Sequence, residues 1–345
     1  EIRHLGYLER LGLWGAGRPH STFEELRAAV ESGGLAAMEL VAMTMRAEGM
    51  LSCRSLSFRG TTFRLVPVAL KGAHVNAYTA ACDFWQRAYK LISVALKARN
   101  LEKRKRKVKD RSDNTNAFQM RQFWSCQQQF FRQLLICAKV DEAMALAQSA
   151  LLRGESVVFT MWSTGEAVTR ALAEREGAEA ISGGFASAPR EIAMRVLEKV
   201  LKPCITEPEQ KRALAGLEQA VSRLELPPNP LDDIIERMGG PLKVAEMTGR
   251  SKRPIKVAGT TAFEDRPDGA NLEEQGAFQR GDKHVAIITE AASAGISLHA
   301  DRRLPKAAQR PRYMISIELP WEADKAVQQL GRVHRSNQAV PPKFA

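Results

Sequence analysis

The chain has 345 residues, 26% of them charged and 44% hydrophobic, a composition that predicts a soluble globular protein with two compact units. Its formal net charge of +12 favours a polyanionic partner, with nucleic acid expected first. No apolar run approaches the roughly 18 residues that span a bilayer, so no membrane partner is expected. Five scattered cysteines without a C-x-x-C pair indicate neither a disulfide framework nor a metal site. The chain begins with Glu1, so we expect it to be part of a longer protein.

Residues 1–72 mix helical and strand patterns. In "STFEELRAAVESGG", Ser21 and Glu24 predict a capping box, and Gly33 and Gly34 predict the end of that helix. A second helix is predicted in "LAAMELVAMTMRAEG" and a strand in "TTFRLVPVAL".

Residues 73–152 are expected to form a helical arm, because 76–98 and 114–152 lack proline and glycine and show helical apolar spacing. Four aromatic residues are expected to pack against neighbouring helices, with stacking on bases as the alternative: Phe118, Trp124, Phe130 and Phe131. Seven basic residues lie between Lys103 and Arg111. This run indicates either a targeting or phosphate-binding patch or a solvated loop.

Residues 153–345 alternate buried-strand and helix patterns. The runs "ESVVFTMW", "KHVAIITEA" and "RYMISIELPW" predict parallel strands with helices on both faces of the sheet, an α/β fold whose ligands bind beyond the carboxyl ends of the strands. The segment 203–281, rich in proline, glycine and charge, is interpreted as an insertion.

Two arginines follow the last predicted strand in "QQLGRVHRSNQ". A three-residue spacing places Arg332 and Arg335 on one face of a predicted helix, as a clamp for an anion. Surface salt bridges to Glu322 or Asp324 are the alternative interpretation.

The blocks "VVFTMWSTGEA", "TEAASAGISL" and "LPWEADKAVQQLGRVHRSNQ" resemble motifs IV, V and VI of the second RecA-like lobe of superfamily-two helicases and Swi/Snf-type ATPases. Further blocks resemble the strawberry notch family of helicase-like transcriptional regulators: "GYLERLGLWGAG", "LAAMELVAM", "LSFRGTTFRL", "FWSCQQQFFRQLLICAKV", "GGPLKVAEMTGR" and "EAASAGISLHADRR". The resemblance implies that 1–72 is the tail of a first lobe, 73–152 an inserted arm and 153–345 a P-loop NTPase-type second lobe.

The resemblance also implies an ATP-dependent helicase or translocase, with ATP and Mg²⁺ held mainly by a first lobe that would precede Glu1, because no G-x-x-x-x-G-K-[ST] occurs here. Arg335 is then the arginine finger and Arg332 its partner. Gln328, Gly295 and Ser297 would lie near the nucleotide. Many superfamily members have Asp or Asn at the position of Ser297. The chain by itself is expected to be inactive.

Five residues are expected to contact nucleic acid in such a lobe: Thr289, Ser163, Thr164, Arg302 and Arg303. DNA or chromatin is the implied partner, transcription factors or histones are possible ones, and the nucleus is the implied location. The alternative function is a non-enzymatic chromatin or transcription-factor scaffold that retains the motor fold.

Overall fold

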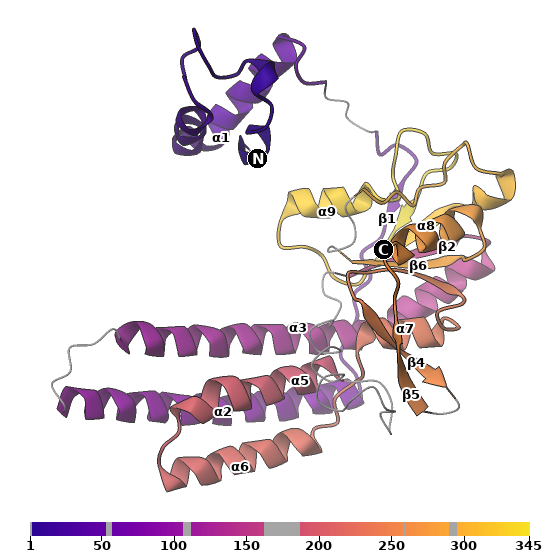
Figure 1. The fold of residues 1–345 in the computed structure, drawn as a ribbon. Coiled ribbons are helices and arrows are strands. Elements are labelled where there is room, and N and C mark those ends of the chain that lie inside the picture. The colour runs from indigo at the N-terminus through magenta and orange to yellow at the C-terminus, as the bar shows by residue number, and fades with distance from the viewer. Residues whose placement is uncertain (1, 53–56, 106–111, 162–186, 258–259, 290–294) are drawn as a thin grey trace. The chain divides into compact units, whose positions relative to one another are not determined.

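The computed structural model describes residues 2–52, 57–105, 112–161, 187–257, 260–289 and 295–345 (Figure 1). The chain divides into two compact units, Glu1–Phe58 and Arg59–Ala345. Thr62 and Phe63, in the segment 1–72 expected as the tail of a first lobe, pair with Lys343 and Phe344 in the sheet of the second unit.

The first unit contains two 3-10 turns, η1 (Ile2–Leu5) and η2 (Glu9–Leu11), and the helix α1 (Phe23–Ala47). Thr22 is the N-cap, and its Oγ1 accepts a hydrogen bond from the Glu25 amide at 3.3 Å. The Glu25 carboxylate in turn accepts from the Ser21 amide at 2.8 Å. The predicted capping box at Ser21 and Glu24 was therefore wrong by one residue.

The range of α1 consists of two helical stretches that meet in a kink at Gly34, where the first helix was predicted to end. Gly34 interrupts α1 with φ 62° and ψ −145°, a conformation that glycine adopts without steric cost, and the helix then resumes. The small core of this unit contains Ile2, Trp14, Leu26 and Val30.

The second unit contains a six-stranded parallel sheet in the order β1-β8-β7-β2-β6-β3. The predicted strands are confirmed as β2 (Ser156–Met161), β6 (Val285–Thr289) and β7 (Arg312–Ser316). The strand predicted in "TTFRLVPVAL" is present as the two-residue β1 (Thr62–Phe63). Two short strands were not predicted: β3 (Val244–Met247) and β8 (Lys343–Phe344). Because β3 belongs to the sheet, segment 203–281 is not simply an insertion.

Helices cover both faces of this sheet, as the sequence predicted. On one face, alternate strand residues such as Phe159 and Ile287 pack with α3 (Ser112–Leu152) and α7 (Pro230–Arg237). On the other face, Val158 and Met314 pack with α8 (Ala270–Arg280) and with the chain around Leu298 and Val333. Beside the sheet, β4 (Lys252–Val257) and β5 (Thr260–Asp265) form an antiparallel hairpin.

The predicted helical arm is present and forms a bundle. The long helices α2 (Ala73–Lys105) and α3 pack with α5 (Ala188–Arg195), its π-helical continuation Val196–Leu201, the turn Lys202–Cys204 and α6 (Pro208–Arg223) (Figure 1). Phe130 lies in the core and Phe131 is partly buried, as expected from core packing. Phe118 and Trp124 are instead 50% and 41% exposed. Residues 106–111 of the basic run lie outside the described residues.

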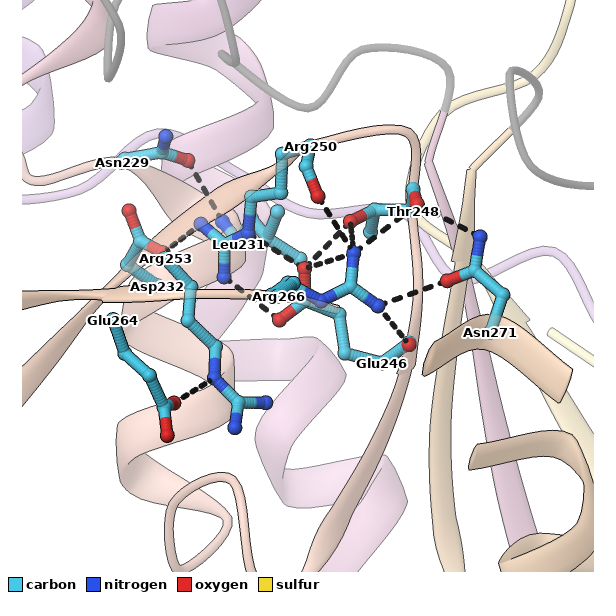
Figure 2. Close-up of polar contacts among 10 residues, drawn as sticks. All are labelled: Asn229, Leu231, Asp232, Glu246, Thr248, Arg250, Arg253, Glu264, Arg266 and Asn271. Atoms are coloured by element: carbon cyan, nitrogen blue, oxygen red, sulfur yellow. Dashed lines mark hydrogen bonds and ion pairs between the residues drawn. The ribbon is translucent and has the colours of Figure 1, made fainter. Parts of the chain in front are cut away.

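A buried ion network fastens β3 to the elements around it (Figure 2). The Arg250 guanidinium donates two hydrogen bonds to the Glu246 carboxylate, at 2.6 and 2.9 Å, and one to Asp232 of α7 at 2.5 Å. The three side chains are only 1–2% exposed. A bidentate guanidinium–carboxylate pair in such surroundings gains strongly from charge and geometry, which offsets the cost of removing both groups from water.

Arg266 extends the network from the hairpin to α8. It donates to the main-chain oxygens of Glu246 at 2.8 Å and Arg250 at 2.9 Å, and to Asn271 Oδ1 at 2.8 Å. Asn271 itself donates to the Thr248 carbonyl at 3.0 Å. Four separate elements therefore contribute side chains to one buried network of charged and polar groups.

The charges set opposite pKa shifts on the two acids. Burial raises the pKa of Asp232 to about 6, although Arg250 opposes the shift. Burial alone would also raise the pKa of Glu246, but the charge and hydrogen bonds of Arg250 outweigh it and hold that pKa below its ordinary value. Glu246 is thus the ionised partner of Arg250, and Asp232 is the group that titrates near neutrality.

We expect Arg250→Ala to lower the free energy of unfolding by about 3–5 kcal/mol, because it leaves two carboxylates buried without their cation. Lys252→Ala is the matched control, since the Lys252–Asp265 pair is 51% and 81% exposed. That control should cost less than about 1 kcal/mol. Urea denaturation measures both, and equal losses would contradict the assignment.

A second test uses pH. Between pH 3.8 and about pH 6, Asp232 is protonated in the folded protein and ionised in the unfolded protein. The stability that Asp232 contributes is therefore lost as the pH rises through this window. Between about pH 4 and pH 6.5 we expect the wild type to lose on the order of 2 kcal/mol relative to Asp232→Asn. Parallel pH profiles of urea unfolding for the two proteins would refute this assignment.

Candidate functional site

The candidate site is built on two chain segments that follow β6 and β7. Main-chain hydrogen bonds join the segments: Leu298 N–H to Arg332 O at 2.7 Å, Ala339 N–H to Ala300 O at 2.7 Å, and Arg302 N–H to Asn337 O at 3.0 Å. The two predicted motifs are therefore held together as one unit.

The arginine pair lies beyond the end of its helix. The helix α9 runs over Ala323–Leu330 and gives way to a turn at Gly331, a residue with poor helix propensity. The expectation that Arg332 and Arg335 share one helix face was therefore wrong. The positive charge of Arg335 still contributes to lowering the pKa of Arg332.

Arg332 is half-buried and faces the motif V segment. Its Nη1 donates to the Ile296 carbonyl at 3.3 Å, while its own carbonyl accepts from Leu298. Burial is the main cause of its lowered pKa, followed by the charge of Arg335. A guanidinium in this position is stabilised by any anion that approaches it.

Arg335 is exposed and is oriented by the turn. Its Nε donates to the Gly331 carbonyl at 3.0 Å, and its amide donates to Gln338 Oε1 at 3.2 Å. No ion pair joins it to Glu322 or Asp324 within the described residues, and Glu322 instead pairs with Lys325 at 3.3 Å. The exposed guanidinium is thus positioned by main-chain contacts.

The residues expected near the nucleotide occupy different environments. Gln328 is exposed on α9, one residue before the buried Gln329. Gly295 has φ 76°, which favours glycine, and a Cβ there would meet no described atom within 4 Å. The backbone conformation therefore accounts for glycine at this position, and steric crowding of a side chain does not. Ser297 is half-buried, and its carbonyl is held by α8.

The residues expected to bind nucleic acid also differ. Thr289 ends β6 and is 1% exposed, and its Oγ1 has no hydrogen-bond partner among the described residues. The Arg303 side chain is 81% exposed and forms a salt bridge with Asp301, with Nη2 2.5 Å from Oδ2. Arg302 donates from Nε to the Gln338 carbonyl at 3.1 Å. The predicted residues Ser163 and Thr164 lie outside the described residues.

A ladder of amide side chains on α8 supports the site, and sequence reasoning missed it. Asn271, Gln275 and Gln279 recur every four residues, which places them on one face of the helix. Gln275 and Gln279 donate from Nε2 to the Ser297 carbonyl at 3.0 and 2.7 Å. Asn271 belongs to the ion network, so α8 connects that network to the segment that contacts Arg332. The four-residue spacing of amides was the available signal.

The ladder also supports a buried cation. Arg312 is 1% exposed and lies 4.7 Å from the centre of the Phe278 ring. It donates to the Leu298 carbonyl at 2.8 Å and to Gln279 Oε1 at 3.2 Å. Burial lowers the pKa of Arg312 to about 10. The position of Arg312 makes it a support for the motif V segment.

At the carboxyl end of β7, α3 reaches the same edge of the sheet. Arg132 pairs with Glu318, and Lys139 donates from Nζ to the Ile317 carbonyl at 3.0 Å. Trp321 is 85% exposed, with Arg132 5.8 Å from the centre of its indole. The arm and the site are therefore connected through α3.

The described residues contain no group of three His, Cys, Asp or Glu side chains that could hold a metal ion. No helix in the described part of the chain is long and apolar enough to cross a membrane.

We expect the double variant Gln275→Ala/Gln279→Ala to loosen the motif V segment, because the Ser297 carbonyl loses both donors. Amide hydrogen exchange at Leu298 should accelerate, and the free energy of unfolding should fall by about 1–3 kcal/mol. Glu273→Ala, at an exposed position on the same helix, is the control and should leave both unchanged. Unaltered exchange at Leu298 in the double variant would show that the amides do not hold this segment.

Comparisons with known proteins agree with this architecture. The family model described as "C-terminal domain on Strawberry notch homologue" matches residues 229–345, and that described as "P-loop containing NTP hydrolase pore-1" matches residues 1–80. The second match relates the chain to nucleotide-binding P-loop proteins. No solved structure matches the chain.

Relatives match along the whole chain. Strawberry notch homolog 2 of Mus musculus is 35% identical over 441 residues, covering 100% of this chain and 32% of the relative. Protein FORGETTER 1 of Arabidopsis thaliana is 30% identical over 486 residues, covering 100% of this chain and 36% of the relative. The strawberry notch homolog of Caenorhabditis elegans is 49% identical over 135 residues, covering 36% of this chain and 7% of the relative. The chain spans about a third of the length of the first two relatives.

Proposed function

The chain belongs to the strawberry notch family, and we propose that it is part of an ATP-dependent helicase or translocase to which it contributes the second RecA-like lobe. The observation that carries this proposal is the arginine pair at the carboxyl edge of the sheet. Arg335 is exposed and Arg332 half-buried, and each guanidinium donates a hydrogen bond to a main-chain carbonyl oxygen. Two adjacent cations held in this way suit the negatively charged phosphates of ATP.

In the proposed mechanism, ATP and Mg²⁺ are held mainly by the first lobe, and the bound nucleotide supplies the phosphoryl group that is transferred to water. Arg335 presents its guanidinium to the charge that develops on that group. Arg332 stays against the Ile296 carbonyl and adds a second positive charge. Residues in the arginine-finger role accelerate phosphoryl transfer by about 10³–10⁵-fold.

Nucleic acid is the proposed track of this motor. The support is the net charge of +12 and the exposed arginines after motif V, Arg302 and Arg303. DNA within chromatin is the proposed form, with transcriptional regulation as the proposed role, the nucleus as the proposed location, and transcription factors or histones as proposed partners.

We expect Arg335→Ala in the full-length protein to reduce kcat for nucleic-acid-stimulated ATP hydrolysis by about 10³-fold or more, since the developing charge loses its donor. Arg335→Lys should recover only part of the rate, because a lysine lacks the planar fork. Lys325→Ala on α9 is the control and should hydrolyse ATP like the wild type.

Two outcomes would contradict the proposal. Equal hydrolysis by the wild type and Arg335→Ala would remove the arginine-finger role. A folded full-length wild type that does not hydrolyse ATP with any nucleic acid would favour the scaffold function instead.

A further inference from the structure

We propose that the exposed side of the α2–α3 helix pair is a binding surface for single-stranded nucleic acid. Tyr89 and Trp124 would stack on unpaired bases, and Lys97 and Arg121 would contact the phosphates. This surface is distinct from the arginine site and does not depend on ATP. Four observations support it: aromatic exposure, the completeness of the core beneath, the placement of the cations and the charge of the arm.

The aromatic pair lies at the surface although its neighbours are buried. Tyr89 and Trp124 are 42% and 41% exposed, and their ring centres are 5.3 Å apart. Trp85 and Phe123 beneath them are at most 1% exposed and contact each other edge to face at 5.3 Å. The outer rings therefore keep part of their surface open to solvent.

The bundle core is complete without the outer pair. Trp85 contacts Phe84, Phe123 and Phe130, and α5 and α6 close the cluster from the other side. A large aromatic side chain that the core does not need, on a charged surface, is typical of an interaction site.

Helical geometry places Arg121 about one turn from Trp124 and Lys97 about two turns from Tyr89. Lys97 follows Tyr89 by eight residues and Arg121 precedes Trp124 by three, so each cation shares the face of its aromatic residue. Tyr89 contacts Trp124 across two helices of opposite direction, so both cations lie on the same side of the ring pair, toward the C-terminal end of α2 and the N-terminal end of α3 (Figure 1). Both are exposed, and neither forms an ion pair with a described side chain.

The charge of the arm identifies the class of partner. Residues 73–152 contain 14 basic and 6 acidic residues, so the arm carries a net charge of +8 out of +12 for the chain. Seven of the basic residues belong to the run from Lys103 to Arg111, and the proposed surface does not include them. Outside that run the arm has seven basic and five acidic residues, and Lys97 and Arg121 are two of the seven. Exposed cations on the same helices as exposed aromatic rings complement a polyanion that also offers flat apolar faces.

A single strand fits these features better than a duplex. In a duplex the base faces are covered by neighbouring bases, whereas a single strand leaves them free to stack on aromatic side chains. Such stacking is worth about 1–3 kcal/mol per base and tolerates any sequence. We therefore expect little sequence preference and a marked dependence on salt.

The test is equilibrium binding of the 345-residue chain, without nucleotide, to a fluorescent oligothymidine and to a duplex of equal length. Trp124→Ala and Tyr89→Ala should each weaken single-strand binding by about 5- to 100-fold, and Trp124→Phe should restore most of it. Leu135→Ala is the matched control, because Leu135 is a 39% exposed apolar residue on the same helix. Circular dichroism during heating confirms that each variant is folded.

The phosphate contacts are tested by salt. In Lys97→Gln/Arg121→Gln, the slope of log K against log salt should fall by about 1.4, the value expected for two phosphates of a single strand. Arg335→Ala should bind the oligonucleotide like the wild type, which separates this proposal from the ATPase. Wild-type affinity in the aromatic variants, equal or tighter binding of the duplex, or binding of no nucleic acid at all would each overturn the proposal. The last of these would point to a protein partner.

Discussion

The buried contact between Arg250 and Glu246 is the constraint on which the second unit depends. A charged residue in the middle of a buried strand is acceptable only because a guanidinium from the following turn meets both of its oxygens. Asp232 and Arg266 then attach α7 and the hairpin to the same point. The edge of the sheet is therefore fixed by ionic geometry, whereas its centre is fixed by apolar packing.

The arginine site depends on the same contact indirectly, through α8. Asn271 joins the network and begins a row of amides on α8 that continues to the Ser297 carbonyl. The residues on either side of Ser297 contact Arg332, one through a carbonyl and the other through an amide. A continuous series of hydrogen bonds thus runs from the sheet edge to the cations. Through this series, α8 fixes the position of the arginine site relative to the sheet edge.

The central strands and the long helices could be predicted from sequence because continuous apolar runs and helical periodicity identify them directly. β3 could not, because Glu246 breaks the apolar pattern and its partner Arg250 looks like a loop charge until the fold brings them together. β8 consists of two residues, too few to show a period, whereas β1 lies within a predicted strand but is much shorter than predicted. The arginine pair could be recognised by type and spacing, but the helix end at Gly331 depends on local backbone energetics. The amide ladder required knowing that α8 lies beside the motif V segment.

The pairing of β1 with β8 has a consequence for the order of assembly during synthesis. Phe63 stacks on Phe344 with ring centres 4.7 Å apart, and the two residues lie near opposite ends of the sequence. On the ribosome, Thr62 and Phe63 leave the exit tunnel long before β8, their neighbour in the sheet that the structure describes, has been translated. The polypeptide must therefore keep this short stretch unpaired while the rest of the sheet forms, and the lobe closes its edge as a late, long-range event.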